Sequence, residues 1–319
     1  MGPLHTLLRS MLKIRMVEEA IAERYYRQKM RCPVHLCIGQ EAISVGVCEV
    51  LGPMDSVYSN HRSHGHYLAK GGRLDAMIAE LHGKVDGCCR GKGGSMHLID
   101  LAAGFSGAVP IVGSTLPIAV GHALAHRIRN EDAISVVFFG DGTIEEGVFH
   151  ESLNFAALKK LKVLFVCENN AFSVYSPLSV RQPPNRSNKK IVEGHGFYHD
   201  SGDGNDVLEV YEKTRQSIDH MKATGQPSFL EFETFRWREH CGPNFDNDLG
   251  YRTECDFKDW VAKCPIKRFI AYLKGEKRLS EKTLASLTQE LEKEIAGAFE
   301  KADNSPWPDS DTAKNPVYA

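Results

Sequence analysis

The sequence predicts an α/β fold with a doubly wound, mostly parallel sheet and added helices at both ends of the chain. Two short apolar runs, residues 133–139 and 163–167, are rich in β-branched and aromatic residues, which is typical of strands buried on both faces of a parallel sheet. Between them, residues 143–160 have the spacing of an amphipathic helix, and Thr143 and Glu146 stand at capping-box positions. Together these runs predict a strand, a crossover helix and a parallel strand.

Composition and charge exclude several classes of protein. The formal net charge of −2 gives no electrostatic case for binding nucleic acid or a membrane surface. No apolar run approaches the roughly eighteen residues that a membrane span needs. Nine cysteines, and a start at Met1-Gly2-Pro3-Leu4 that resembles neither a signal nor a transit peptide, favour a reducing, cytoplasmic location.

The segments before the first apolar run are expected to be mainly helical. Apolar spacing predicts helices over residues 4–30, from the 35–42 stretch to about residue 51, over 74–81 and over 118–127. Residues 59–67 interrupt them with a glycine-containing loop that holds three histidines and an arginine. A further glycine-rich loop, residues 90–97, is expected to support a binding site.

The segments after the second apolar run are expected to complete one domain. The predicted elements are an exposed loop over 181–190, an amphipathic helix over 206–224, a strand over 228–234, a mobile loop over 236–252 and two helices within 257–301. Residues 1–302 are therefore predicted to form a single domain. Residues 303–319, with three prolines and few apolar side chains, are predicted to be a flexible tail.

Polar residues at the ends of the two central strands predict a binding site. Asp141 and Asn170 would lie at the carboxyl ends of neighbouring strands, where open α/β sheets bind ligands. Gly142 would let the backbone approach a phosphate, and a helix start at Thr143 would offer free N–H groups. One carboxylate and one amide oxygen beside a phosphate suit Mg2+. The alternative is a plain strand–turn–helix connection without a ligand.

A longer pattern is more specific than the triplet Gly140-Asp141-Gly142 alone. Gly140-Asp141-Gly142 is followed, after residues 143–168, by Asn169-Asn170, a spacing that matches the diphosphate and metal motif of thiamine-diphosphate enzymes. From about residue 11 to residue 273 the chain resembles the α subunit of the decarboxylating component of 2-oxo acid dehydrogenase complexes, of the pyruvate and acetoin dehydrogenase type. The resemblance implies the diphosphate-binding half of the thiamine-diphosphate fold.

The same resemblance implies thiamine diphosphate and Mg2+ as cofactors. The metal would be held by Asp141, Asn170 and the backbone carbonyl of Phe172. The residues implied to bind the cofactor are His61, Arg62, Val112, Asp141, Gly142, Thr143, Asn170, Arg236 and His240.

Three histidines are implied to be catalytic. His64 and His240 would handle protons at the reaction centre, and His35 would orient the substrate. The chain departs from the family at His61, where a tyrosine is usual, and over residues 241–248, which replace a serine-containing stretch. These departures leave the identity of substrate and acceptor open.

One necessary part of such an enzyme is missing from the sequence. The family needs a glutamate from a second domain to activate the cofactor, and after Asn170 the chain has room for only two more strands. The resemblance implies a separate β subunit, two α and two β chains, and transfer of the acyl group to a lipoyl-bearing acyltransferase. We expect the chain alone to be inactive. The alternatives are a carboligase or ketol transferase with the same cofactor, and a non-catalytic binder of magnesium and diphosphate.

Overall fold

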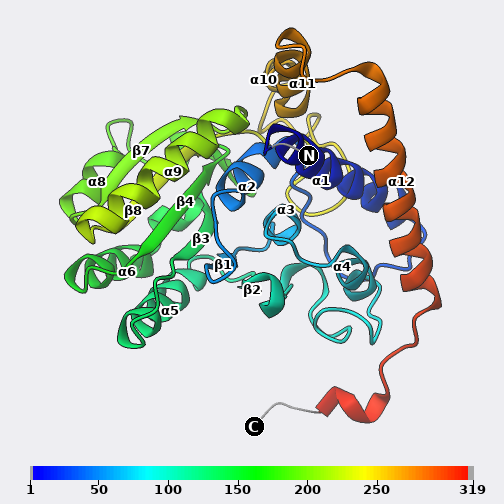
Figure 1. Cartoon of the computed structure of the whole chain (residues 1–319), viewed down its shortest axis with the longest axis horizontal. Coiled ribbons are helices and arrows are strands. Elements are labelled where there is room, and N and C mark those ends of the chain that lie inside the picture. Colours follow the sequence, from blue (N-terminus) through cyan, green and yellow to red (C-terminus); the bar gives the residue numbers. More distant parts are fainter. Residues whose placement is uncertain (1–2, 315–319) are drawn as a thin grey trace.

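The computed structural model describes residues 3–314. At its centre lies a six-stranded sheet with the order β2-β1-β3-β4-β8-β7, in which every neighbouring pair is parallel (Figure 1). The predicted doubly wound parallel sheet is therefore confirmed. Its strands are β1 (Ser56–Ser59), β2 (Phe105–Ala108), β3 (Ser135–Gly140), β4 (Val163–Asn169), β7 (Tyr198–Asp203) and β8 (Ser228–Glu233).

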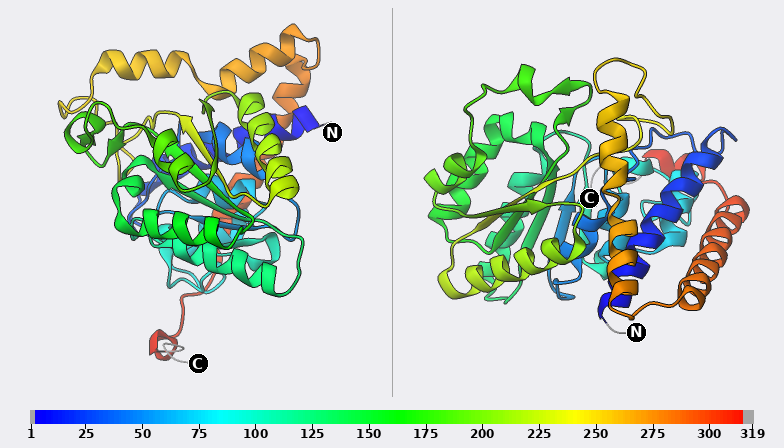
Figure 2. Two further views of the ribbon diagram at one scale, coloured as in Figure 1. Left: turned by 90° about the vertical axis from the view of Figure 1, so that its left-hand side faces the viewer. Right: turned by 90° about the horizontal axis from the view of Figure 1, so that it is seen from above.

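Helices cover both faces of this sheet and bury a separate apolar core on each (Figures 1 and 2). Side chains alternate along β3, so that Val136 and Phe138 enter one core while Val137 and Phe139 enter the other. The smaller core lies under α5 (Thr115–Ile128), α6 (Gly147–Leu158) and α8 (Asn188–Gly194). The larger core is built with α1 (Pro3–Tyr25), α2 (Glu41–Cys48), α3 (His64–Ala69), α4 (Leu74–Leu81), α9 (Val207–Thr224), α11 (Pro265–Gly275) and α12 (Glu281–Asn304).

The two central strands lie side by side and in register. Gly140, at the end of β3, pairs with Glu168 in β4. Asp141 and Asn170 therefore emerge at the same edge of the sheet, as the sequence predicted. Beyond this edge the chain forms a short antiparallel hairpin from β5 (Phe172–Ser173) and β6 (Ser176–Pro177).

The crossover helix begins later than the sequence predicted. Residues Asp141–Glu145 form a 3₁₀ turn, and α6 starts only at Gly147. Glu146 is extended, with ψ of 141°, and no side chain caps the helix. The predicted capping box with Thr143 is wrong, because Glu146 precedes the helix and cannot be its third residue.

Between residues 254 and 304 the structure contains three α-helices, where two were predicted. The additional helix is α10 (Glu254–Ala262), which begins with a capping box between Thr253 and Asp256. Pro265 then opens α11, because proline is accepted in the first turn of a helix and not in its interior.

The predicted tail begins inside α12, which continues to Asn304. Beyond it, the hydroxyl of Ser305 donates a hydrogen bond of 2.6 Å to Asp86, and the ammonium of Lys84 lies 4.0 Å from the centre of the Trp307 ring. The first residues of the tail are thus attached to the domain. Residues 315–319, like Met1 and Gly2, lie outside the described residues. Within residues 3–314, no helix is both long and apolar enough to cross a membrane.

Candidate active site

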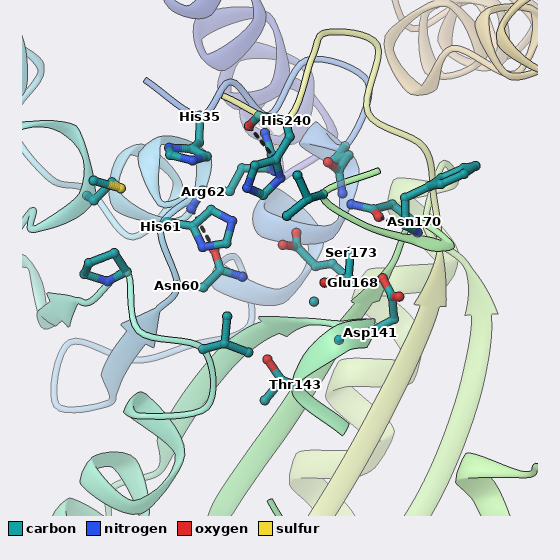
Figure 3. A pocket seen from close by; sticks show the side chains of 18 residues that line it. His35, Asn60, His61, Arg62, Asp141, Thr143, Glu168, Asn170, Ser173 and His240 are labelled. Carbon is teal, nitrogen blue, oxygen red and sulfur yellow. Dashed lines mark hydrogen bonds between the residues drawn. The ribbon is translucent and has the colours of Figure 1, made fainter. Parts of the chain in front are cut away.

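A cavity of about 210 Å³ lies at the carboxyl edge of the sheet, where strands β2, β1, β3 and β4 end (Figure 3). This is the edge at which open α/β sheets bind ligands. Polar side chains from distant segments converge on it. The residues that line it are His35, Gln40, Asn60, His61, Arg62, Met96, Pro110, Val112, Gly140, Asp141, Gly142, Thr143, Glu168, Asn170, Phe172, Ser173, Val174 and His240.

One side of the cavity is the sheet edge itself. Asp141 is buried there, with Thr143 and Asn170 beside it. A Cβ atom at Gly142 would lie 2.8 Å from the hydroxyl oxygen of Ser173, so a larger residue here would force the Ser173 side chain to shift. The side-chain oxygen of Asn170 accepts a hydrogen bond of 3.2 Å from the backbone N–H of Phe172. These contacts form a tight cradle lined by backbone.

The buried carboxylate of Asp141 requires a cation. Burial raises its pKa, and the guanidinium of Arg181 opposes that rise. Arg181 forms ion pairs with both Asp141 and Glu145. Since a buried charge is stable only when it is paired, the site is suited to positive charge at this position.

The opposite side of the cavity is a cluster of three histidines, His35, His61 and His240. Their ring centres lie 4.6 to 5.1 Å apart, and Figure 3 shows the rings facing one another across from Asp141. Burial, followed by the charge of Arg62, lowers the pKa of His35 to about 2 and those of His61 and His240 to about 3. All three imidazoles are therefore neutral at physiological pH.

Arg62 brings the histidine cluster together. Its guanidinium donates hydrogen bonds to the carbonyl of Leu36, at 2.7 Å, and to that of His240, at 3.1 Å. Gly242, two residues later, donates its N–H to the carbonyl of Val34 at 2.8 Å. Burial lowers the pKa of Arg62 to about 10, so it remains a cation at physiological pH.

Several buried polar atoms at the cavity have no partner in the described chain. They are Nδ1 of His35 and both polar side-chain atoms of Gln40. Because burying a polar group without a hydrogen bond is costly, such atoms indicate a place for a polar ligand. The cavity thus offers a carboxylate and an amide on one side and hydrogen-bonding imidazoles on the other.

Comparison with known proteins identifies the family. The sequence model described as "Dehydrogenase E1 component" matches residues 9–311. The chain belongs to this family. It is 36% identical to the α subunit of the acetoin:2,6-dichlorophenolindophenol oxidoreductase of Bacillus subtilis, over 98% of this chain and 92% of the relative. It is 37% identical to the chloroplastic pyruvate dehydrogenase E1 subunit alpha-3 of Arabidopsis thaliana, over 98% and 74% of the two chains. The pyruvate dehydrogenase E1 α subunit of Rickettsia bellii is 31% identical, over 97% and 94%.

Most of the residues predicted to form the site line the cavity of this E1 chain. The structure brings together ten of the twelve, although the predicted helix start at Thr143 is a 3₁₀ turn. The ten are His35, His61, Arg62, Val112, Asp141, Gly142, Thr143, Asn170, Phe172 and His240.

His64 does not line the cavity. It is the first residue of α3, is fully buried, and has both ring nitrogens in hydrogen bonds. Nδ1 lies 2.5 Å from a carboxylate oxygen of Glu18, and Nε2 lies 2.7 Å from the hydroxyl of Ser95. The expectation that His64 faces the reaction centre is corrected: it joins α1 to the glycine-rich loop that carries Met96 to the cavity.

Arg236 also lies behind the cavity wall. Its guanidinium donates hydrogen bonds to the carbonyl of Val174, at 2.8 Å, and to the hydroxyl of Tyr251, at 2.7 Å. It also pairs with the buried Asp246, which pairs in turn with Arg252. Arg236 does not line the cavity, where its predicted contact with a diphosphate would have to be made. The loop over 236–252, predicted to be mobile, is instead anchored by a buried ionic network that includes Asp246 from the unusual 241–248 stretch.

Sequence reasoning missed Glu168 as a residue of the cavity. Its carboxylate is buried at the cavity and lies 3.1 Å from Nε2 of His66. The available signal was its position: it directly precedes Asn169-Asn170 and pairs with Gly140 at the end of the sheet. Asn60, Gln40 and Ser173 were missed because no local pattern distinguishes them from loop residues.

Proposed function

We propose that this chain is the α subunit of an E1 enzyme that decarboxylates a 2-oxo acid with thiamine diphosphate and Mg2+ and transfers the acyl group to a lipoyl acceptor. The observation that carries the proposal is the two-sided cavity, with Asp141 and Asn170 facing the histidine cluster. The relatives, which are named as pyruvate dehydrogenase and acetoin oxidoreductase α subunits, support the same chemistry.

The residues at the sheet edge fit a metal-bound diphosphate. Asp141 and Asn170 offer oxygen ligands, and the backbone carbonyl of Phe172 is the proposed third ligand. Gly142 lets the backbone approach closely, and Thr143 adds a hydroxyl. The remaining proposed cofactor contacts are His61 and Arg62 for the diphosphate and Val112 at the mouth of the cavity.

The histidine cluster fits a substrate whose oxygen atoms gain negative charge. When bound, thiamine diphosphate supplies the nucleophilic carbon and the electron sink for loss of carbon dioxide. Neutral imidazoles at His35 and His240 can donate or accept a hydrogen bond without bringing a full charge into the cavity. The fixed cation of Arg62 stabilises developing negative charge near them. Arg236 acts indirectly, by holding Val174 in the wall.

A β subunit is part of the proposal. Within residues 3–314, the sheets are the six-stranded sheet and the β5–β6 hairpin. The relatives are named as α subunits, which supports a partner chain that carries the second domain. We propose that this partner supplies the activating glutamate in an assembly of two α and two β chains. All nine cysteines carry free thiols, in agreement with the proposed reducing, cytoplasmic environment.

The test is to co-express the chain with the β-subunit candidate encoded beside it. Carbon dioxide release from a panel of 2-oxo acids is measured with thiamine diphosphate and Mg2+, with a lipoyl domain or dye as acceptor in one set and aldehydes in another. We expect release that depends on both subunits and is coupled to lipoyl acylation or dye reduction.

Other outcomes separate the alternatives. Release that requires an aldehyde would favour a carboligase, and cofactor binding without turnover of any substrate would favour a binder. Turnover by the purified single chain would contradict the need for a β subunit. An Asp132→Asn control alters an exposed carboxylate paired with Lys162, far from the proposed chemistry, and should leave every rate unchanged.

A further inference from the structure

The segment over residues 176–186 is attached to the proposed metal-binding turn, residues 141–145, by side chains rather than by backbone pairing. Arg181, the last residue of α7 (Leu178–Arg181), reaches Asp141 with one terminal nitrogen and Glu145 with the other. Its Nε donates a hydrogen bond of 3.0 Å to the carbonyl of Ser176, which keeps the side chain directed at the turn. Arg181 therefore connects the 176–186 segment to the proposed metal ligand.

This contact competes with a metal ion. The side chain of Asp141 is 2% exposed and that of Arg181 is 11% exposed, so little water screens their charges. A divalent cation bound to the Asp141 carboxylate would repel the guanidinium that occupies it in the structure. Both cations are satisfied by the same buried carboxylate, and each weakens the binding of the other.

We propose that Arg181 holds the place of the divalent cation at Asp141 and thereby sets the metal affinity of the site. Metal binding displaces Arg181 from Asp141, and the 176–186 segment loosens from the 141–145 turn. The proposal rests on the metal site of the proposed function and adds to it a residue that opposes binding.

The exchange is feasible because Arg181 has a second anionic partner. Glu145 has 25% of its side chain exposed and also accepts a hydrogen bond of 2.8 Å from the amide of Gln182. Arg181 can leave Asp141 and still keep this pair, so its charge is never left buried alone. By linkage, the cost of displacing Arg181 lowers metal affinity by the same factor by which metal weakens the attachment of the segment.

A neighbouring arginine provides a matched control. Arg186 lies in the same segment and donates a hydrogen bond of 2.7 Å to the carbonyl of Ile144, in the same turn. Within the described residues it makes no hydrogen bond or ion pair with Asp141, so it attaches the segment without occupying that carboxylate. Arg186→Met should therefore loosen the segment while the Arg181–Asp141 ion pair stays in place, so metal affinity should change far less than in Arg181→Met.

The experiment measures metal binding and segment mobility without turnover. The full chain is titrated with Mn2+ alone, and binding is measured from the electron paramagnetic resonance signal of the free Mn2+. Hydrogen exchange is measured over residues 174–187. We expect Arg181→Met to bind Mn2+ about ten-fold more tightly, within the usual range of coupling between two sites. Mg2+ should increase exchange of the segment in the original chain and have no effect in Arg181→Met. Arg181→Lys, which keeps a charge but reaches less far, should have intermediate affinity.

Three outcomes would overturn the proposal. Weaker Mn2+ binding by Arg181→Met would make Arg181 part of the loaded site. Slower hydrogen exchange of the segment on adding Mg2+ would mean that metal binding strengthens the attachment by Arg181 instead of opposing it. Mn2+ binding that survives Asp141→Ala would place the metal elsewhere. None of these readouts uses substrate, so they fail or succeed independently of the turnover test of the proposed function.

Discussion

The two sides of the cavity are built in different ways. The sheet-edge side comes from two strand ends that are neighbours in the sheet, with Asp141 after β3 and Asn170 after β4. The histidine side comes from three segments far apart in the chain, carrying His35, His61 and His240, and is assembled by Arg62. The first side is charged and cradled by backbone, while the second is a set of neutral rings. The difference predicts that the sheet-edge side makes the larger contribution to cofactor binding, and that His35 and His240 on the other side govern turnover.

The largest effect is expected from removing the charge on the sheet-edge side. Asp141→Asn should abolish metal-dependent binding of the cofactor and reduce turnover by about a thousand-fold, because the proposed metal would contribute several kcal/mol of charge stabilisation. The measurement is cofactor binding by calorimetry, beside turnover, in the α and β assembly. Unchanged cofactor binding in this variant would remove Asp141 from the metal site.

A second expected effect concerns the support of the histidine side. Asp246→Asn should destabilise the chain by about 3 kcal/mol, because it leaves the buried Arg236 and Arg252 without their anion. Urea unfolding measures this loss. Asp248→Asn, at an exposed position in the same loop, is the control and should be neutral. Equal stability of the two variants would mean that the loop is not held by the ionic network.

The histidines themselves should affect rate more than binding. His240→Asn should lower kcat by about a hundred-fold while cofactor affinity stays within a few-fold, since proton transfer and hydrogen bonding by one positioned side chain contribute about that much. His195→Asn, at the end of α8 and away from the cavity, serves as the control. A loss of cofactor affinity as large as the loss of kcat would contradict the division between the two sides.

The smallest effect, counted per pH unit, is expected on acid stability. The pKa of His61 is about 3 in the folded chain against an ordinary value of 6.5, so between these values the unfolded chain binds the extra proton. Folding stability should therefore fall as pH decreases through this window, by at most about 1.4 kcal/mol per pH unit for each such histidine. Urea unfolding at several pH values, repeated with His61→Asn, should show a shallower slope in the variant. Equal slopes would show that His61 is not buried in its neutral form.

Local patterns predicted the elements whose residues carry their own periodicity. The helix over 74–81 and the strands over 133–139 and 163–167 were predicted because apolar spacing is decided by neighbours in the chain. Predictions at boundaries were less accurate. The helix α6 was predicted to start at Thr143 but starts at Gly147, because residues 141–145 form a 3₁₀ turn that contacts Arg181.

By itself the sequence determined the parallel sheet, the strand ends that bear Asp141 and Asn170, and the family to which the chain belongs. These depend on residue spacing within short stretches. Only the tertiary structure decided that His35, His61 and His240 meet, that His64 and Arg236 lie behind the cavity wall, and that Arg181 occupies the carboxylate of Asp141. The reason is that burial and charge pairing depend on which distant segments are packed together, and local spacing does not specify them.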